Sequence, residues 1–192
     1  MGMKRALAAL VLASLSCALA ASPLSVSGTV TGDVPAGARV GAWLVNVSGA
    51  PVTELGSVAV QDGRFSLSVA DAAPPARSVS ALSAMDLTWP GVTGDATVTP
   101  NVRTAEARLF VYGDANGNGR RDESEALLEA GVQSGRASVV LVYVDRDANV
   151  KGDRGLNVDL AGGWNSVSIE LGKALKTSVA RGASGVRLVV TR

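Results

Sequence analysis

Apolar and polar residues alternate over much of this chain, the pattern that places successive side chains on opposite faces of a β-strand. In the first such stretch, Leu24, Val26 and Val30 alternate with serines and threonines. The same period of two recurs over residues 65–69, 156–160, 167–171 and 186–190. Each stretch predicts a strand with one buried face and one solvated face.

Longer runs are apolar at nearly every position. Residues 40–47 and 137–144 read this way, which is typical of central strands covered on both faces. Residues 105–112 predict a further strand. Helix is expected to be scarce, with Ser124–Ala130 and Gly172–Thr177 as the candidate segments. Strand signals that recur every eight to twelve residues predict an all-β fold, an antiparallel β-sandwich.

Three short motifs near the start carry a family resemblance. They read Ser27-Gly28-Thr29-Val30, Gly37-Ala38-Arg39-Val40 and Asp62-Gly63-Arg64-Phe65. Together they resemble the transthyretin-like or carboxypeptidase-regulatory-like sandwich, an Ig-like arrangement. The resemblance implies a fold and supplies no catalytic residue. Residues 21–192 then form one β-sandwich domain or two subdomains of about 21–100 and 101–192.

The N-terminus has the order of a secretory signal peptide. Lys4 and Arg5 precede an apolar run over residues 6–15, and Ala18-Leu19-Ala20 provides small residues for cleavage. We expect residues 1–20 to be removed and the protein to be secreted or periplasmic, at the cell envelope. The alternatives are a retained N-terminal anchor and lipidation at Cys17, the single cysteine.

Composition excludes several function classes. The chain contains no histidine, and cleavage would remove its one cysteine. Imidazole or thiolate metal sites and Ser-His-Asp or Cys-His catalysis are therefore excluded from the exported form. Removing Lys4 and Arg5 changes the net charge from +1 to −1 (16 basic against 17 acidic residues), which argues against nucleic-acid partners. No membrane insertion of the mature chain is expected.

One stretch carries candidate chemistry, the twelve residues Asp114–Glu125, reading DANGNGRRDESE. Oxygen side chains occupy positions 1, 3, 5, 9 and 12, and Gly119 occupies position 6, where the chain must turn sharply. Position 7 contributes a backbone carbonyl. The predicted calcium ligands are Asp114, Asn116, Asn118, Arg120, Asp122 and Glu125.

This pattern resembles the EF-hand calcium loop, and more closely the isolated loops of dockerins and of adhesin B-type repeats. Two departures separate it from paired EF-hands: Arg121 stands where an apolar residue pairs two loops, and a strand precedes the loop where a helix would enter. The resemblance implies a structural calcium site and not a sensor switch. The alternative is a plain polar connection, because Asn-Gly dipeptides favour turns.

The function expected from these features is a secreted, noncatalytic, calcium-binding β-sandwich that acts as a binding or structural module, with a cell-envelope protein or glycan as partner. One alternative is a carbohydrate-binding module. Trp89 and Trp164 are the better candidates for exposure, whereas Trp43 in an apolar strand is expected in the core. The other alternative is a glycan hydrolase that uses two carboxylates, with four candidates: Glu54, Asp86, Glu106 and Glu170.

A second acidic stretch contains Asp145, Asp147, Asn149 and Asp153. It has no glycine at position 6 and no acid at position 12, so it does not match the calcium-loop pattern. A solvated hairpin tip is the favoured interpretation, with a second metal site as the alternative.

Overall fold

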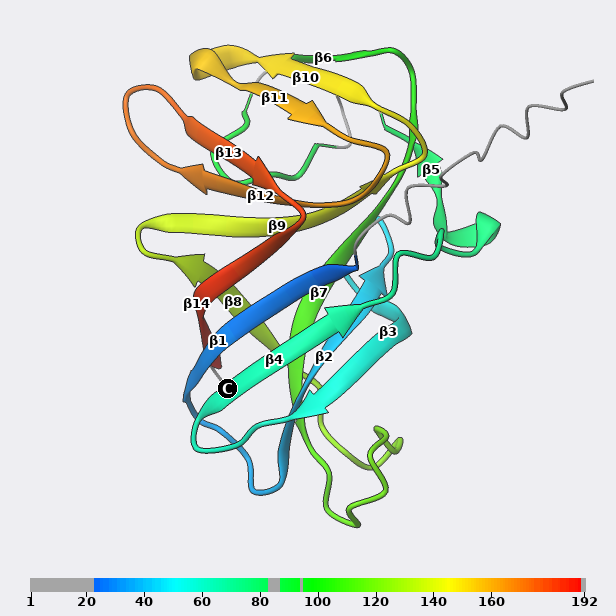
Figure 1. The fold of residues 1–192 in the computed structure, drawn as a ribbon, viewed down its shortest axis with the longest axis vertical. Coiled ribbons are helices and arrows are strands. Elements are labelled where there is room, and N and C mark those ends of the chain that lie inside the picture. Colours follow the sequence, from blue (N-terminus) through cyan, green and yellow to red (C-terminus); the bar gives the residue numbers. More distant parts are fainter. Residues whose placement is uncertain (1–22, 83–86, 94, 191–192) are drawn as a thin grey trace, which may run out of the picture.

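A computed structural model describes residues 23–82, 87–93 and 95–190 (Figure 1). The predicted signal peptide, Cys17 and Asp86 lie outside the described residues. The described chain is nearly all β, with 3-10 turns at Ala76–Ser78 and Asp153–Gly155 and no α-helix. The all-β prediction with little helix is thereby confirmed, and large mixed sheets fit a sandwich or barrel-like arrangement.

The early strands form as the alternation predicts. Strand β1 (Leu24–Gly32) pairs antiparallel with β4 (Arg64–Val69), and β2 (Ala38–Val45) pairs antiparallel with β3 (Pro51–Ala59). In β4 every second residue is buried, as expected for a strand with one face on a core. The other edge of β1 pairs with the last strand, β14 (Gly182–Val190), in parallel. The sheet is therefore mixed, and the prediction of a purely antiparallel sandwich is wrong in this respect.

Strand β7 (Arg103–Gly113) is the central strand of the large sheet. One edge pairs with β2, and its start also pairs with the short β5 (Ser80–Ala81). The other edge divides its pairing between β9 (Ala137–Val144) and β8 (Leu128–Ser134). Alternate residues Ala105, Ala107, Leu109 and Val111 enter the first hydrophobic core, which also takes side chains from β1, β2, β4 and β14.

A second core forms on the other side of β9. The sheet continues from β9 to β12 (Gly163–Glu170) and β13 (Lys176–Ala180). A separate three-stranded sheet of β6 (Ala96–Thr99), β10 (Ala148–Gly152) and β11 (Asn157–Leu160) covers it at one end of the molecule (Figure 1). Val142 and Val144 of β9 and Ile169 of β12 pack against Val150 and Val158 from this small sheet.

Strands from before and after residue 100 share one sheet and one core. Strand β2 pairs with β7, and β1 pairs with β14. The first core likewise combines residues of both segments. The division into subdomains at about residue 100 stays a prediction, while the pairing joins the two segments along two long ladders.

Both predicted helices are wrong. Residues 123–125 form a turn and a bend, and Leu128–Ser134 is strand β8. Residues 172–174 form bends, and Lys176–Ala180 is strand β13. The reason is competition from neighbouring strands: β8 completes ladders with β7 and β14, and β13 completes one with β12, which local helix preference cannot offset.

Candidate metal centre

The 114–125 loop connects β7 to β8 and lies at the end of the molecule opposite the three-stranded sheet (Figure 1). The predicted exit strand, 137–144, is β9, one hairpin further along the chain. The loop starts from a fixed point, because the Asp114 N–H donates to the Gly37 carbonyl at 3.1 Å. The first ligand position is thereby tied to the β1–β2 connection.

Asp114 organises the first half of the loop. Its Oδ1 accepts the Asn118 N–H at 3.0 Å, and its Oδ2 accepts the Gly119 N–H at 2.8 Å. Gly119 has φ +78°, a conformation that disfavours a β-carbon, as the position-6 argument requires. The Asp114 side chain is 7% exposed, so this carboxylate faces the interior of the loop.

The two asparagines are exposed but belong to the same hydrogen-bond network. Asn116 Oδ1 accepts the Asn118 N–H at 3.0 Å, and Asn118 Oδ1 accepts the Arg120 N–H at 2.7 Å. Their amide nitrogens donate to Asp122 Oδ2 at 2.7 Å and 3.1 Å. Oxygens of positions 3, 5 and 9 thus lie within one small hydrogen-bonded group.

Glu125 closes the loop from its far end. Its Oε1 accepts the Ala115 N–H at 2.8 Å, and its Oε2 accepts the Asp122 N–H at 2.9 Å. The residue is only 9% exposed although it carries a charge. The last ligand position therefore folds back across the loop to its second residue, which brings the two ends together.

Two arginines contact the loop, and a third is exposed. Arg39 Nη1 lies 3.8 Å from Asp114 Oδ2, and its Nη2 donates to the Ser57 hydroxyl at 3.3 Å. Arg121 Nε donates to the Glu125 carbonyl at 3.0 Å, so position 8 is used to hold the end of the loop. The Arg120 side chain is exposed, in keeping with a ligand position that offers only its carbonyl.

The loop offers only oxygen donors, the kind of ligand that a hard cation prefers. In the part of the chain that the structure describes, no group of three or more His, Cys, Asp and Glu side chains is gathered in metal-binding geometry. The loop's own N–H groups and asparagine amides occupy the inward carboxylate oxygens. A carboxylate has about four lone-pair positions, so Asp114 and Glu125 retain capacity for an ion, whereas both amide contacts to Asp122 must open. Once those two amide contacts open, the loop offers only oxygen ligands, the set that calcium prefers.

The second acidic stretch is arranged differently. Asp145 Oδ1 accepts the Arg103 N–H at 3.0 Å, and Asp147 Oδ1 accepts the Gly162 N–H at 2.7 Å. Asn149 lies within strand β10, and Asp153 begins a 3-10 turn. Its four side chains thus lie on a turn, a strand and a second turn.

The tryptophan predictions are wrong. Trp89 and Trp164 are 4% and 1% exposed, in the second and first cores respectively, whereas Trp43 is only partly buried. Trp164 packs edge-on to Tyr143 with ring centroids 5.7 Å apart. Pro90 beside Trp89 and Gly163 beside Trp164 suggest exposed turns, but long-range packing covers both rings.

The described candidate acids for hydrolysis lie on three strands. Glu54 on β3 accepts from the Tyr112 hydroxyl at 3.5 Å, Glu106 on β7 pairs with Arg108, and Glu170 on β12 lies 3.9 Å from Lys176. Sequence reasoning missed the group that Glu106 belongs to, in which Arg108 also pairs with Glu129 at 3.0 Å. A glutamate and an arginine two residues apart within an otherwise apolar strand were the available signal.

Comparisons with protein-family models, curated proteins and solved structures give no significant match to this chain. Among residues 23–82, 87–93 and 95–190, no helix has the length and apolar character needed to cross a membrane.

Proposed function

We propose that this protein is a noncatalytic, calcium-stabilised β-sandwich that is exported and acts at the cell envelope as a binding or structural module. The observation that carries the proposal is the pair of largely buried carboxylate side chains, Asp114 and Glu125, at opposite ends of a loop whose Asn116, Asn118 and Asp122 side chains hydrogen-bond to one another or to the loop backbone. A buried carboxylate needs a compensating partner, and a divalent cation is the partner that this oxygen spacing suits.

Calcium would stabilise the folded chain by relieving repulsion. Three of the loop's four acidic residues, Asp114, Asp122 and Glu125, are candidate ligands. The loop keeps a net charge of −2 after Arg120 and Arg121 are counted, and Arg39 lies 3.8 Å from one carboxylate oxygen. An ion that binds only the folded loop adds about 2.7 kcal/mol at 100 times its dissociation constant. A single unpaired loop is expected to bind in the extracellular range of about 10⁻⁴–10⁻³ M.

We further propose that the framework around the first core is Ig-like and related to the transthyretin-like sandwich. Support comes from the antiparallel pairs β1–β4 and β2–β3 and from the Gln61–Arg64 turn, where Asp62 and Gly63 both have positive φ. That framework would hold the start of the 114–125 loop, through Gly37 before β2 and through β7.

Export rests on the sequence of residues 1–20. We propose that cleavage follows Ala20, which removes no described residue because the described chain begins at Pro23. Mass spectrometry of protein recovered from the periplasm or medium is expected to show a chain that begins at Ala21. An intact N-terminus, or a lipid on Cys17, would contradict this part of the proposal.

The calcium proposal is tested by calorimetry and thermal unfolding of protein made without residues 1–20. Wild-type protein is expected to bind one calcium ion, and Glu125→Gln is expected to lose that binding, because it removes the carboxylate that closes the loop. Glu123→Gln is the matched control, since Glu123 is exposed in the same loop and carries the same charge.

Saturating calcium is expected to raise the melting temperature of the wild-type protein and Glu123→Gln by roughly 5–10 °C, and magnesium by less. Comparing each protein in calcium and in chelator separates metal binding from any direct cost of the substitution. An unchanged melting temperature for wild-type protein in chelator and in millimolar calcium would falsify the proposal.

A further inference from the structure

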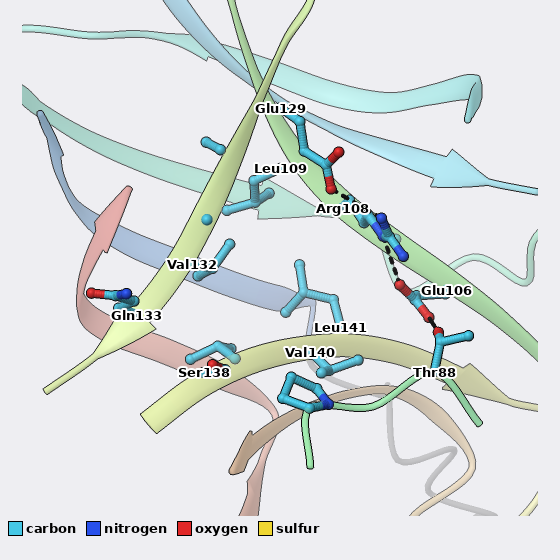
Figure 2. A pocket seen from close by; sticks show the side chains of 15 residues that line it. Thr88, Glu106, Arg108, Leu109, Glu129, Val132, Gln133, Ser138, Val140 and Leu141 are labelled. Atoms are coloured by element: carbon cyan, nitrogen blue, oxygen red, sulfur yellow. Dashed lines mark hydrogen bonds and ion pairs between the residues drawn. The ribbon is translucent and has the colours of Figure 1, made fainter. Parts of the chain in front are cut away.

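Strands β7, β8 and β9 diverge around a cavity of about 250 Å³ in the large sheet, away from the 114–125 loop (Figure 2). The ladders explain the divergence. Strand β7 pairs with β9 only over Thr104–Ala107 and with β8 only over Phe110–Val111, while β8 and β9 meet only at their hairpin. Left between the ladders are Arg108–Leu109, Ala130–Val132 and Val139–Val140, which together we name the strand opening.

The strand opening places backbone N–H and C=O groups beside the first hydrophobic core. Peptide groups that lie outside the ladders lack a strand partner on that side, and such groups seek other donors and acceptors. Behind them, Leu109, Val132 and Leu141 form an apolar wall (Figure 2). A small cavity with apolar sides and a few converging polar groups has the general character of a ligand site.

A charged group lines one side of the strand opening. Arg108 Nε donates to Glu106 Oε1 at 2.9 Å, and Arg108 Nη1 donates to Glu129 Oε1 at 3.0 Å. The Thr88 hydroxyl donates to Glu106 Oε2 at 3.4 Å, and the chain of contacts is visible in Figure 2. Burial alone would lower the pKa of Arg108, but the hydrogen bonds and charges of Glu106 and Glu129 together raise it.

These groups give the cavity both donors and acceptors without a strong net charge. Two carboxylates and one guanidinium sum to −1, and Gln133 and Ser138 add neutral polar groups to the lining. A cationic ligand would meet Arg108 between the two carboxylates, and an anionic ligand would meet two like charges. A neutral ligand that carries several hydroxyl groups on a compact apolar ring matches the mixed donors, acceptors and apolar wall.

We propose that the strand opening binds a neutral sugar unit, with Glu106, Arg108 and Glu129 contacting its hydroxyl groups and Val132 and Leu141 contacting its ring. The cavity is at the small end of ligand pockets, which commonly measure about 300–1,000 Å³, so one sugar ring is the natural occupant. The site lies on β7, β8 and β9 and does not depend on an ion in the 114–125 loop.

The first test uses ligand-observed NMR and calorimetry with glucose, galactose and N-acetylglucosamine at millimolar concentration, with ethanolamine as a cationic probe. At least one sugar is expected to bind, with the same affinity in Glu125→Gln. That variant separates failure of this proposal from failure of the calcium proposal. Binding of ethanolamine alone, or of no probe, would overturn the sugar assignment.

The second test blocks the cavity. A Cβ at Gly131 would meet no atom within 4 Å, so Gly131→Leu adds a side chain at the lining without a clash at its first carbon. Sugar binding is expected to fall by about tenfold or more. Ser184→Leu is the matched control, because Ser184 is an exposed strand residue away from the lining. Equal sugar affinity in Gly131→Leu and Ser184→Leu would show that the sugar does not bind in the strand opening.

The third test removes one rim carboxylate. Glu129→Gln is expected to weaken sugar binding by about tenfold, because a charged acceptor is lost. Glu123→Gln removes the same charge from the exposed part of the 114–125 loop and is expected to leave sugar binding unchanged. Because Glu129 is largely exposed, this variant keeps the proposal testable if Gly131→Leu does not fold. Unchanged sugar affinity in Glu129→Gln would show that the Glu129 carboxylate does not contact the sugar.

Discussion

Two acidic stretches of similar composition adopt opposite arrangements in this protein. In the 114–125 loop, Asp114 and Glu125 are buried and accept hydrogen bonds from the loop's own backbone. In the 145–153 stretch, Asp145 and Asp147 accept hydrogen bonds from Arg103 and Gly162, which lie far away in the sequence. The carboxylates of the first stretch bond within their own loop, and those of the second bond to separate segments.

Backbone conformation explains the difference. Gly117 and Gly119 have φ of +70° and +78°, and these positive values let the 114–125 loop turn back on itself, so that the Asp114 and Glu125 carboxylates accept hydrogen bonds from backbone N–H groups of the same loop. The second stretch runs into strand β10, where successive side chains point to opposite faces. Both stretches therefore carry similar side-chain oxygens, and the backbone conformation decides whether the carboxylates bond within their own stretch or to other segments.

The largest expected contrast comes from a matched glycine pair. Gly119 and Gly155 both have φ +78°, and a Cβ at either would meet its nearest neighbour at an ordinary 3.9 Å. Gly119→Ala and Gly155→Ala should each cost roughly 1–2 kcal/mol of stability, because alanine disfavours this conformation. Only Gly119→Ala is expected to lose the calcium-dependent rise in melting temperature. Equal calcium responses in the two variants would show that the conformation at Gly119 is not needed for calcium binding.

An aspartate pair tests the same contrast through charge. Asp114→Asn keeps the size of the side chain but removes a carboxylate ligand, and is expected to weaken calcium binding at least about tenfold. Asp147→Asn makes the same change in the second stretch and is expected to leave calcium affinity unchanged. Calcium titrations by calorimetry distinguish them. Weaker calcium binding in Asp147→Asn would mean that the second stretch also contributes to a metal site.

Removing the charge of Arg39 is expected to change calcium affinity by less than the aspartate substitution does. Arg39 places a positive charge 3.8 Å from Asp114 Oδ2, where it competes with a cation for the carboxylate. Arg39→Gln is therefore expected to raise calcium affinity by roughly three- to tenfold at low salt, and by less at high salt. Calorimetric titration at two ionic strengths measures this. A lower affinity in Arg39→Gln would show that Arg39 supports the loop more than it opposes the ion.

The smallest effect concerns acid stability in the second stretch. The Arg103 N–H, followed by Arg146, lowers the pKa of Asp145 below its ordinary value of 3.8. The stability that this carboxylate contributes is then present above about pH 3.8 and is lost as the pH falls through the lower folded pKa. Asp145→Asn should lower the melting temperature at pH 7, and its difference from wild-type protein should shrink below pH 3.8. A constant difference across that range would contradict the assignment.

Local pattern predicted much of the strand content. The alternation at Leu24–Thr31 and at Phe65–Val69 became β1 and β4, because a half-buried strand needs only a period of two. Leu128, Ala130 and Val132 show the same period of two, because they alternate with polar residues or glycine, and they form β8 in place of the expected helix. Short segments satisfy either period, and pairing with β7 and β14 selects the strand.

The candidate metal ligands could be named in advance because loop ligation depends on spacing within twelve adjacent residues. The Glu106–Arg108–Glu129 group could not be found that way. Glu129 reaches Arg108 only because β8 turns back along β7 after the 114–125 loop. A contact between separate strands depends on register, which local sequence does not specify.

The sequence by itself determined which residues favour strands, where oxygen ligands recur at loop spacing, and which chemistries the missing histidines exclude. Only the tertiary structure decided the parallel pairing of β1 with β14, the burial of Trp89 and Trp164, and the strand opening between β7, β8 and β9. The physical reason is how far apart in the sequence the interacting residues lie. Propensity and loop geometry act between neighbouring residues, whereas strand order, burial and cavities arise from contacts between segments that the chain brings together only on folding.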